Sequence, residues 1–278
     1  MDVFEQHVNE TLALIGQEKL SYYKEEAPIF QKAYDYVKEY AYQKKLTNTA
    51  IALRVVRALH SGTYRGKVTL EDGSVVKRPY VCHCLAVAQM IINLHIPLSH
   101  EEEDVVLSAA LCHDIPAYVT FSKGFSELTQ VYHLSVPVTS LVSFIYTRNL
   151  QTEADKAAFF KRMEGSKLGM IVKLADRGNV VEGLYNVSVW KAQEYIHETK
   201  TYYMPLCVYG REKYPELEQP FGVLLEKIRS LIDATEILVV RYVKTEMELT
   251  DKILRLKEDN ARMRSFIRKR NEIKKIIT

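Results

Sequence analysis

The sequence has few of the residues that interrupt helices. Its 278 residues include only 11 glycines and 8 prolines, and apolar residues recur at helical spacing over long stretches. Glycine and proline mark turns and disfavour helix interiors, so their scarcity predicts a mainly helical protein. The chain is long enough for one large domain or two small ones with a substantial core.

Several other features are absent, and each absence excludes a class of protein. The four cysteines form no C-x-x-C pair, which predicts reduced core residues and argues against a disulfide framework. No run of about 18 apolar residues occurs, which argues against a membrane-spanning helix. The first residues, MDVFEQHVNE, lack the basic and apolar regions of a secretory signal. These features together predict a cytoplasmic protein.

The net charge of the chain is small as well. The formal net charge is +3, which does not require a nucleic-acid partner. The segment RMRSFIRKRNEIKK, residues 262–275, is strongly basic, with seven Lys or Arg and one Glu. A solvated basic helix face is its simpler interpretation, and a contact with nucleic acid or membrane is the alternative.

The apolar pattern divides the chain into helices, one hairpin and one linker. Residues 66–78 alternate around Asp72–Gly73, which predicts a β-hairpin insert with a two-residue loop. Pro97 should end a helix, and Ser99 with Glu102 predicts a capping box that opens the next one. Further helices are expected over residues 134–148, 152–163, 166–185 and 187–204. The Pro- and Gly-containing segment YGREKYPELEQPFG, residues 209–222, is interpreted as a linker between a domain at 1–210 and a helical extension at 221–278.

The extension carries its own repeat. Apolar residues step by 4 and 3 in alternation, as in a coiled coil, with one polar member in the series Leu249, Ile253, Leu256, Asn260, Met263 and Ile267. Homo-oligomerisation through residues 242–270 is one interpretation, in which Asn260 sets the register. Because the run is shorter than three heptads, an amphipathic helix packed on its own domain is the other.

Four polar residues lie in apolar segments predicted as helices, and they carry the chemistry: His83, His113, Asp114 and Asp176. Imidazole nitrogens and carboxylate oxygens form the ligand set of a borderline divalent cation such as Mn, Fe, Co or Zn. A helical bundle can bring such side chains to one interior point. Since adjacent helical residues diverge by about 100°, His113 and Asp114 can share a cation only in a cleft between helices. Taken singly, each is a hydrogen-bonded or ion-paired core residue, so a structural protein without metal is also considered.

The H…HD…D order resembles the HD superfamily of metal-dependent phosphohydrolases, whose fold is an all-α helical bundle. Four segments, in the right order between residues 50 and 210, are similar to the alarmone hydrolase domain of the RelA/SpoT family. LHSGTYRG…RPYVCHCLAVA resembles H-x-G-x-x-R followed by P-Y-x-x-H-P-x-x-V-A, and LSAALCHD resembles A-A-x-L-H-D. GMIVKLADRGNVVEGL is similar to I-K-L-A-D-R-x-x-N, and HETKTYYMPL to E-T-x-x-x-Y-x-P-L.

The resemblance implies a role for each matching residue. The four polar residues would hold a Mn ion, with Fe, Co, Zn or Mg as alternatives. Arg65 would stack on a guanine base, and His60 belongs to the same motif. Lys173 and Arg177, which flank Asp176, would act beside Asp114 in catalysis. The implied reaction removes the 3′-pyrophosphate of ppGpp or pppGpp, and the roughly 70 residues after 210 are too few for a synthetase domain.

Three departures from the family pattern motivate a second hypothesis. The family has Glu-Asp where this chain has Ala117 and Tyr118, so the acids that organise the attacking water are missing. The family Asn position is occupied by Val180, with Asn179 one residue early; Asn179 and Tyr118 are retained as candidate substrate-binding residues. Cys84 replaces the family Pro. Glu127 and His133 are candidate substitutes for the missing acids.

Two functions follow as expectations. The first is a metal-dependent phosphohydrolase acting on a phosphorylated or pyrophosphorylated nucleotide, with ppGpp as first candidate. The second is a degenerate domain that binds a guanine nucleotide without hydrolysing it and signals or scaffolds through its C-terminal helix.

Overall fold

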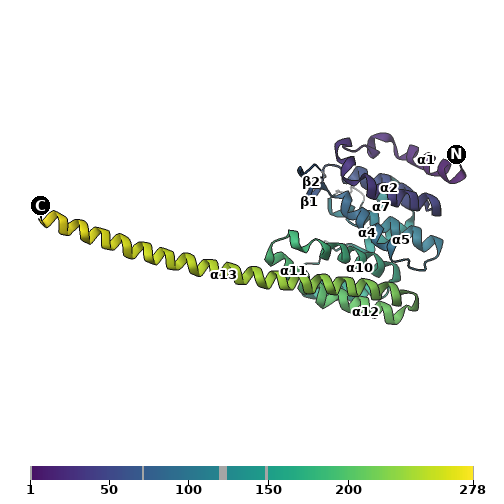
Figure 1. The fold of residues 1–278 in the computed structure, drawn as a ribbon. Coiled ribbons are helices and arrows are strands. Elements are labelled where there is room, and N and C mark those ends of the chain that lie inside the picture. Colours follow the sequence, from purple (N-terminus) through teal and green to yellow (C-terminus); the bar gives the residue numbers. More distant parts are fainter. Residues whose placement is uncertain (1, 71, 119–123, 148–149, 278) are drawn as a thin grey trace.

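The computed structural model describes residues 2–70, 72–118, 124–147 and 150–277, except for the side chains of Tyr118 and of residues 269–277. It confirms the expected all-α fold with one small hairpin and a long C-terminal helix (Figure 1). Among these residues, no helix combines the length and the hydropathy needed to cross a membrane.

The first 60 residues are mainly helical. It contains α1 (Val3–Ile15), α2 (Ala27–Lys44) and α3 (Thr47–Leu59), with short 3-10 turns at Gln17–Leu20 and Lys24–Glu26. The N-terminus of α3 is held by a buried acid of a neighbouring helix, because both Asp104 carboxylate oxygens accept hydrogen bonds from the backbone N–H groups of Asn48 and Thr49. This contact fixes α3 against the helix that carries the His-Asp pair.

The core consists of helices that pack on one another: α4 (Val81–Asn93), α5 (His100–Cys112), α8 (Val136–Ile145) and α10 (Lys167–Glu182). Helix α4 is apolar on almost every side and is accordingly buried along most of its length. Helix α5 opens with the predicted capping box, in which Ser99 Oγ accepts from Glu102 N–H and Glu102 Oε2 accepts from Ser99 N–H. Shorter helices α6 (Ile115–Tyr118), α7 (Ser126–Gln130) and α9 (Glu153–Met163) surround this core.

The hairpin lies where the sequence predicts it, with strands β1 (Tyr64–Thr69) and β2 (Val75–Pro79) paired antiparallel. The prediction of a two-residue loop is wrong. Leu70 N–H donates to Ser74 O, so three residues lie between these partners, and Asp72 Oδ1 accepts from Ser74 N–H and Oγ–H. The aspartate thus stabilises a wider turn than a two-residue loop allows.

The linker predicted at residues 209–222 is also wrong, because most of it is helical. Helix α11 (Val189–Glu198) continues through a π-helical turn, Thr199–Tyr203, into α12 (Met204–Lys213), and α13 (Glu218–Ile277) begins after a 3-10 turn at Pro215–Leu217. Pro220 stands in the first turn of α13, where a missing N–H costs nothing, and Pro205 is the second residue of α12, directly after the π-helical turn. Gly210 lets Phe221 approach closely, since a Cβ there would lie 2.7 Å from the Phe221 ring.

Helix α13 has 60 residues and extends about 90 Å at 1.5 Å per residue. Its first turns belong to the core, with Phe221, Leu224, Ile228 and Ile232 buried. The rest leaves the body as a single rod (Figure 1), and every described residue from 244 to 268 is exposed. The interpretation of the heptad segment as a helix packed on its own domain is therefore wrong.

Candidate metal centre

Three core helices bring the four predicted metal ligands together. His83 lies on α4, Asp176 on α10, and the His113–Asp114 pair at the end of α5. His83 Nε2 is 3.2 Å from Asp176 Oδ1 and 3.5 Å from Asp114 Oδ2. His113 Nε2 is 3.3 Å from Asp114 Oδ2 and 3.6 Å from Asp176 Oδ1. Both imidazole nitrogens therefore face both carboxylates, and the group of His83, His113 and Asp176 could hold a metal ion.

The adjacent His113 and Asp114 converge because α5 stops at this point. Cys112 is its last helical residue, His113 is the C-cap, and Asp114 lies in the turn before α6. His113 Nδ1–H donates to the Ala110 carbonyl at 2.7 Å, which orients the ring back along α5. The Asp114 carboxylate, in this turn, approaches the same point, with its Oδ2 3.3 Å from His113 Nε2.

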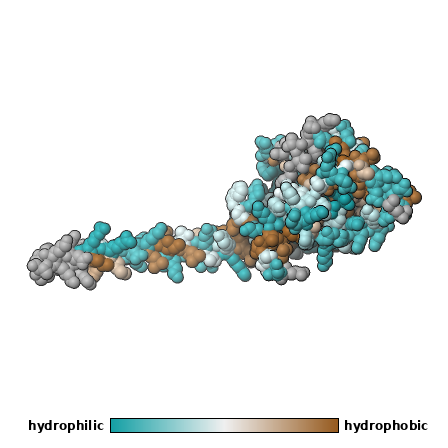
Figure 2. Space-filling view, turned by 90° about the horizontal axis from the view of Figure 1, so that it is seen from above, coloured by the Kyte–Doolittle hydropathy of each residue, from teal (hydrophilic) through white to brown (hydrophobic). Residues whose placement is uncertain are grey.

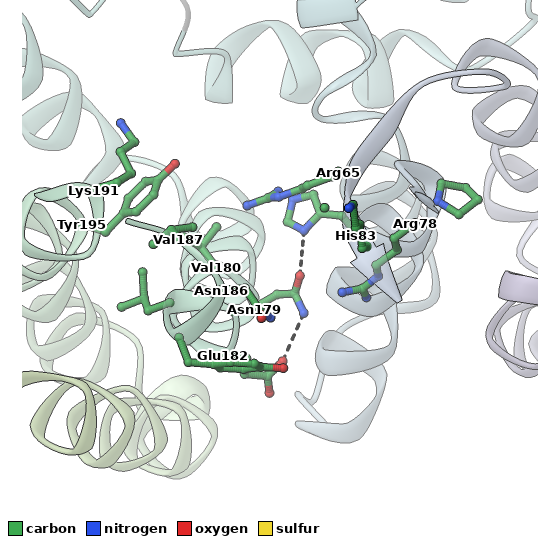
Figure 3. Close-up of a pocket in the computed structure, with 16 residues that line it drawn as sticks. Arg65, Arg78, His83, Asn179, Val180, Glu182, Asn186, Val187, Lys191 and Tyr195 are labelled. Carbon is green, nitrogen blue, oxygen red and sulfur yellow. Dashed lines mark hydrogen bonds between the residues drawn. The ribbon is translucent and has the colours of Figure 1, made fainter. Parts of the chain in front are cut away.

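Asn179 fixes the tautomer of His83. The Asn179 Nδ2–H donates to Glu182 Oε2 at 3.1 Å, so its Oδ1 faces His83 Nδ1 at 2.7 Å (Figure 3). Because that amide oxygen can only accept, His83 Nδ1 carries the hydrogen. The Nε2 atom of His83 is then the ring nitrogen that faces the carboxylates.

The same reasoning applies to His113, whose Nδ1–H is taken by a carbonyl. Both Nε2 atoms are buried, and neither makes a hydrogen bond within the described part of the chain. Unprotonated nitrogens at these positions would point their lone pairs at two carboxylates. The lone pairs and the carboxylates repel each other unless a positive charge lies between them. The donor set and these two orphaned nitrogens therefore fit a divalent cation.

In metal-free protein a proton supplies this charge. Burial alone would lower the pKa of His113, but the Asp114 and Asp176 carboxylates outweigh it and raise the pKa to about 10. Burial opposes ionisation of Asp176 as well, yet Lys173 and His113 hold its pKa well below the usual range. Lys173 Nζ donates to Asp176 Oδ2 at 2.8 Å, which leaves Oδ1 to face the histidines.

Two pockets border the centre, and between them they reach His83, Asp114 and Asp176. The metal-side pocket, of about 410 Å³, is lined by three acids, Asp114, Asp176 and Glu198, together with several cationic and aromatic side chains, among them Lys156, Lys173, Arg177 and Tyr203. The hairpin-side pocket, of about 680 Å³, reaches His83 and lies between the hairpin residues and α11 (Figure 3). Arg65, Val180 and Tyr195 line both, so the two cavities adjoin.

The other predicted site residues lie at different distances from this centre. Lys173 and Arg177 line the metal-side pocket, each already paired with an acid: Lys173 with Asp176, and Arg177 with Glu198. Arg65 lines both pockets, with its guanidinium carbon 5.7 Å from the Tyr80 ring centroid. Asn179 lines the hairpin-side pocket. The Tyr118 side chain lies outside the described residues.

His60, Glu127 and His133 line neither pocket. His60 is buried behind Tyr80, on which it stacks with a centroid distance of 4.9 Å. Ala117, which stands where the resembling family has an acid, is half-buried in α6. The described residues thus supply no substitute for the missing acid pair at those predicted positions.

Two residues of the centre were missed in the sequence. Tyr80 O–H donates to Asp114 Oδ2 at 2.6 Å, and Glu198 pairs with the buried Arg177 guanidinium, which also lies 3.9 Å from the Tyr203 ring centroid. Tyr80 stands in the RPYVCH motif, three residues before His83, so one helical turn could have predicted its proximity. Glu198 stands in the HETKTYYMPL segment, but that motif does not join it to Arg177, because the two residues come from different helices.

Asn179 should act as a positioning residue for His83. Replacing it with alanine removes the acceptor that holds the tautomer, and changes to such supporting partners typically cost 10- to 100-fold in metal affinity. We expect a loss of that size in a Mn²⁺ titration. Asn186→Ala, which changes an amide in the same pocket, is the matched control and should leave the affinity unchanged. Equal affinities for the two variants would contradict the role.

His60 should make the protein sensitive to acid. Burial lowers its pKa from 6.5 to about 4, so the unfolded chain binds the extra proton first as the pH falls. The contribution of neutral His60 to the free energy of unfolding is fully present above pH 6.5. It is lost progressively as the pH falls toward 4, by about 3 kcal/mol in total. His60→Phe keeps an aromatic ring beside Tyr80 and should reduce this loss. Urea unfolding of both proteins at about pH 7.5 and about pH 4.5 measures it; equal pH dependence would contradict the assignment.

Comparison of the sequence with models of known families gives no match, and comparison with curated proteins gives none either. The interpretation of this centre therefore depends on its geometry and on the motifs described above.

Proposed function

We propose that this protein is a metal-dependent phosphohydrolase of the HD type that acts on a phosphorylated or pyrophosphorylated nucleotide. The observation that carries the proposal is the convergence of His83 and His113 Nε2 with the carboxylates of Asp114 and Asp176 beside two adjoining pockets. The order of these ligands along the chain matches the H…HD…D pattern.

The donor set favours a borderline divalent cation. Two imidazole nitrogens and two carboxylate oxygens suit Mn, Fe, Co or Zn. The resemblance to the alarmone hydrolases makes Mn²⁺ the first candidate, with Mg as a further alternative. When bound, such an ion lowers the pKa of coordinated water and polarises a phosphoryl oxygen. The chain's own residues orient this centre: Asn179 and Ala110 fix the imidazoles, while Tyr80 and Lys173 hold the carboxylates through hydrogen bonds.

The surrounding charges suit an anionic substrate. In the metal-side pocket the cations Lys156, Lys173 and Arg177 are matched with acids. In the hairpin-side pocket, Arg65, Lys67 and Arg78 make no ion pair within the described residues, and Figure 3 shows Arg65 and Arg78 near His83. Unmatched cations beside a metal centre favour phosphate groups as ligands.

A nucleoside would suit the same space. The hairpin-side pocket has the size of a small-molecule site and offers both stacking and hydrogen-bonding side chains, among them Tyr185, Tyr195 and Asn186. With the resemblance to alarmone hydrolases, this makes ppGpp the first candidate and other nucleoside phosphates the next.

The test is a panel of nucleotides incubated with the Mn²⁺-loaded protein, with release of phosphate and pyrophosphate measured. We expect turnover of at least one nucleotide and its loss in His113→Ala. Absence of any product across the panel, from protein shown to contain metal, would overturn the proposal.

Ala117 favours a second function. Because α6 offers a methyl group where the resembling hydrolases have an acid, a proton acceptor for the attacking water is missing, and losing one typically costs 10²- to 10⁴-fold. A domain of this kind would bind a guanine nucleotide without hydrolysing it. Equilibrium binding of GDP and ppGpp at micromolar concentrations, with no product formed after prolonged incubation, would favour this function over the first.

A further inference from the structure

The outer part of α13 exposes an apolar seam that is interrupted at Asn260. Leu249, Ile253, Leu256, Met263 and Ile267 are each between 48 and 61% exposed, although they are large hydrophobic residues. In Figure 2 hydrophobic and hydrophilic patches alternate along the rod, away from the body. An isolated helix gains little stability without packing, so a seam of this length indicates a partner.

The heptad positions of the seam select a partner helix. Steps of 4 and 3 place the residues Ile253, Asn260 and Ile267 at a positions, and Leu249, Leu256 and Met263 at d positions. Isoleucine at a with leucine at d favours two-stranded parallel coiled coils over trimers and tetramers. We propose that α13 forms a parallel two-stranded coiled coil with a second copy of this chain.

Asn260 sets the orientation. In a parallel pair each a residue faces the a residue of the other helix, so the two Asn260 amides can bond to each other in one register. In an antiparallel pair an a residue faces a d residue, and Asn260 would meet leucine, methionine or tyrosine. Burying an amide without a partner costs about 1–3 kcal/mol for each of the two chains.

Flanking charges are consistent with this register. Position 259 of one helix faces position 264 of the other in a parallel pair, which places Asp259 against Arg264 of the partner subunit. Lys252 would meet Lys257 of the partner subunit, a repulsion of similar size, and an exposed pair of either kind is worth only about 0–1 kcal/mol. The energies of these exposed charge pairs are smaller than the cost of burying two unpaired Asn260 amides. The Asn260 pair therefore determines the orientation of the two helices.

The parallel arrangement also places both basic segments, residues 262–275, at the same end. Repulsion between them should weaken the dimer at low salt, because exposed charges are screened within about 10 Å at 0.1 M. The dimer should therefore dissociate less as salt is raised.

Sedimentation and cross-linking of the whole chain test the proposal. Met263→Cys places a thiol at a d position, and mild oxidation should join most of the chains into disulfide-linked dimers. Glu258→Cys, on the outer face of the same helix, is the matched control and should remain largely uncrosslinked. The four native cysteines are buried and do not interfere.

A dimer in sedimentation, cross-linked through position 263 and strengthened by salt, supports the proposal. A monomer at tens of micromolar would overturn it. So would a dimer in which Met263→Cys links no better than Glu258→Cys, since this indicates another orientation or another interface. Leu256→Asp provides a further check, because it should convert the dimer to monomer, with a loss of helical content in circular dichroism no larger than the outer part of α13 contributes.

Discussion

Replacing His113 with alanine should lower phosphohydrolase turnover about 1,000-fold or more. His113 is 3% exposed, and its Nε2 lies between two carboxylates, so its loss removes a nitrogen donor that no described neighbour can replace. A metal ion supplies several kcal/mol of transition-state stabilisation, and each 1.36 kcal/mol corresponds to tenfold in rate. Initial rates with saturating Mn²⁺ measure the effect.

The matched control is His100→Ala on the same helix. His100 is exposed at the first residue of α5, where its Nε2 contacts the Lys44 carbonyl, so its removal should change turnover less than twofold. Turnover in His113→Ala within tenfold of the unmodified protein would contradict the assignment of His113 as a ligand.

Replacing Lys173 with methionine should lower the free energy of unfolding of the metal-free protein by about 3–5 kcal/mol, the range for breaking a buried ion pair. Lys173 is 5% exposed, and Asp176 depends on it for its low pKa. Without the ammonium group, the Asp176 carboxylate stays buried beside Asp114 with less compensating positive charge. Added Mn²⁺ should restore part of the loss, because a bound cation replaces the missing charge.

Urea unfolding with EDTA and with Mn²⁺ measures both effects. Lys161→Met is the control, since Lys161 pairs with Glu164 on an exposed helix face and such pairs contribute about 0–1 kcal/mol. If Lys173→Met lowered the free energy of unfolding in EDTA by no more than Lys161→Met, the proposed stabilisation by the Lys173–Asp176 ion pair would be contradicted.

Much of the fold could be predicted because its signals are local. Apolar periodicity placed α8, α9 and α10 within a few residues of their observed bounds, and the Ser99–Glu102 box located the start of α5. The prediction of a linker at 209–222 was wrong because it considered the prolines and glycines of this segment without their contacts. Gly210 is there to admit Phe221, a packing reason that involves residues on two helices and leaves no trace in the local sequence.

The candidate site likewise has a part that the sequence predicts and a part that it does not. The convergence of His83, His113, Asp114 and Asp176 could be predicted because imidazoles and carboxylates in apolar helices need partners, and their order matched a known pattern. The supporting contacts could not. Asn179 seemed misplaced by one residue along α10, yet its amide reaches His83 on α4 and fixes the tautomer. Such a bond depends on how two helices pack, which sequence spacing does not specify.

The most direct test of the metal centre is a count of the metal held by the whole chain. Protein stripped with EDTA, incubated with excess Mn²⁺ and passed through a desalting column should retain about one ion per chain, as elemental analysis would show. His83→Ala and His113→Ala should each retain close to none, and His100→Ala should match the unmodified protein. Retention of no divalent metal by the unmodified chain, or equal retention by the His83 and His113 variants, would contradict the account.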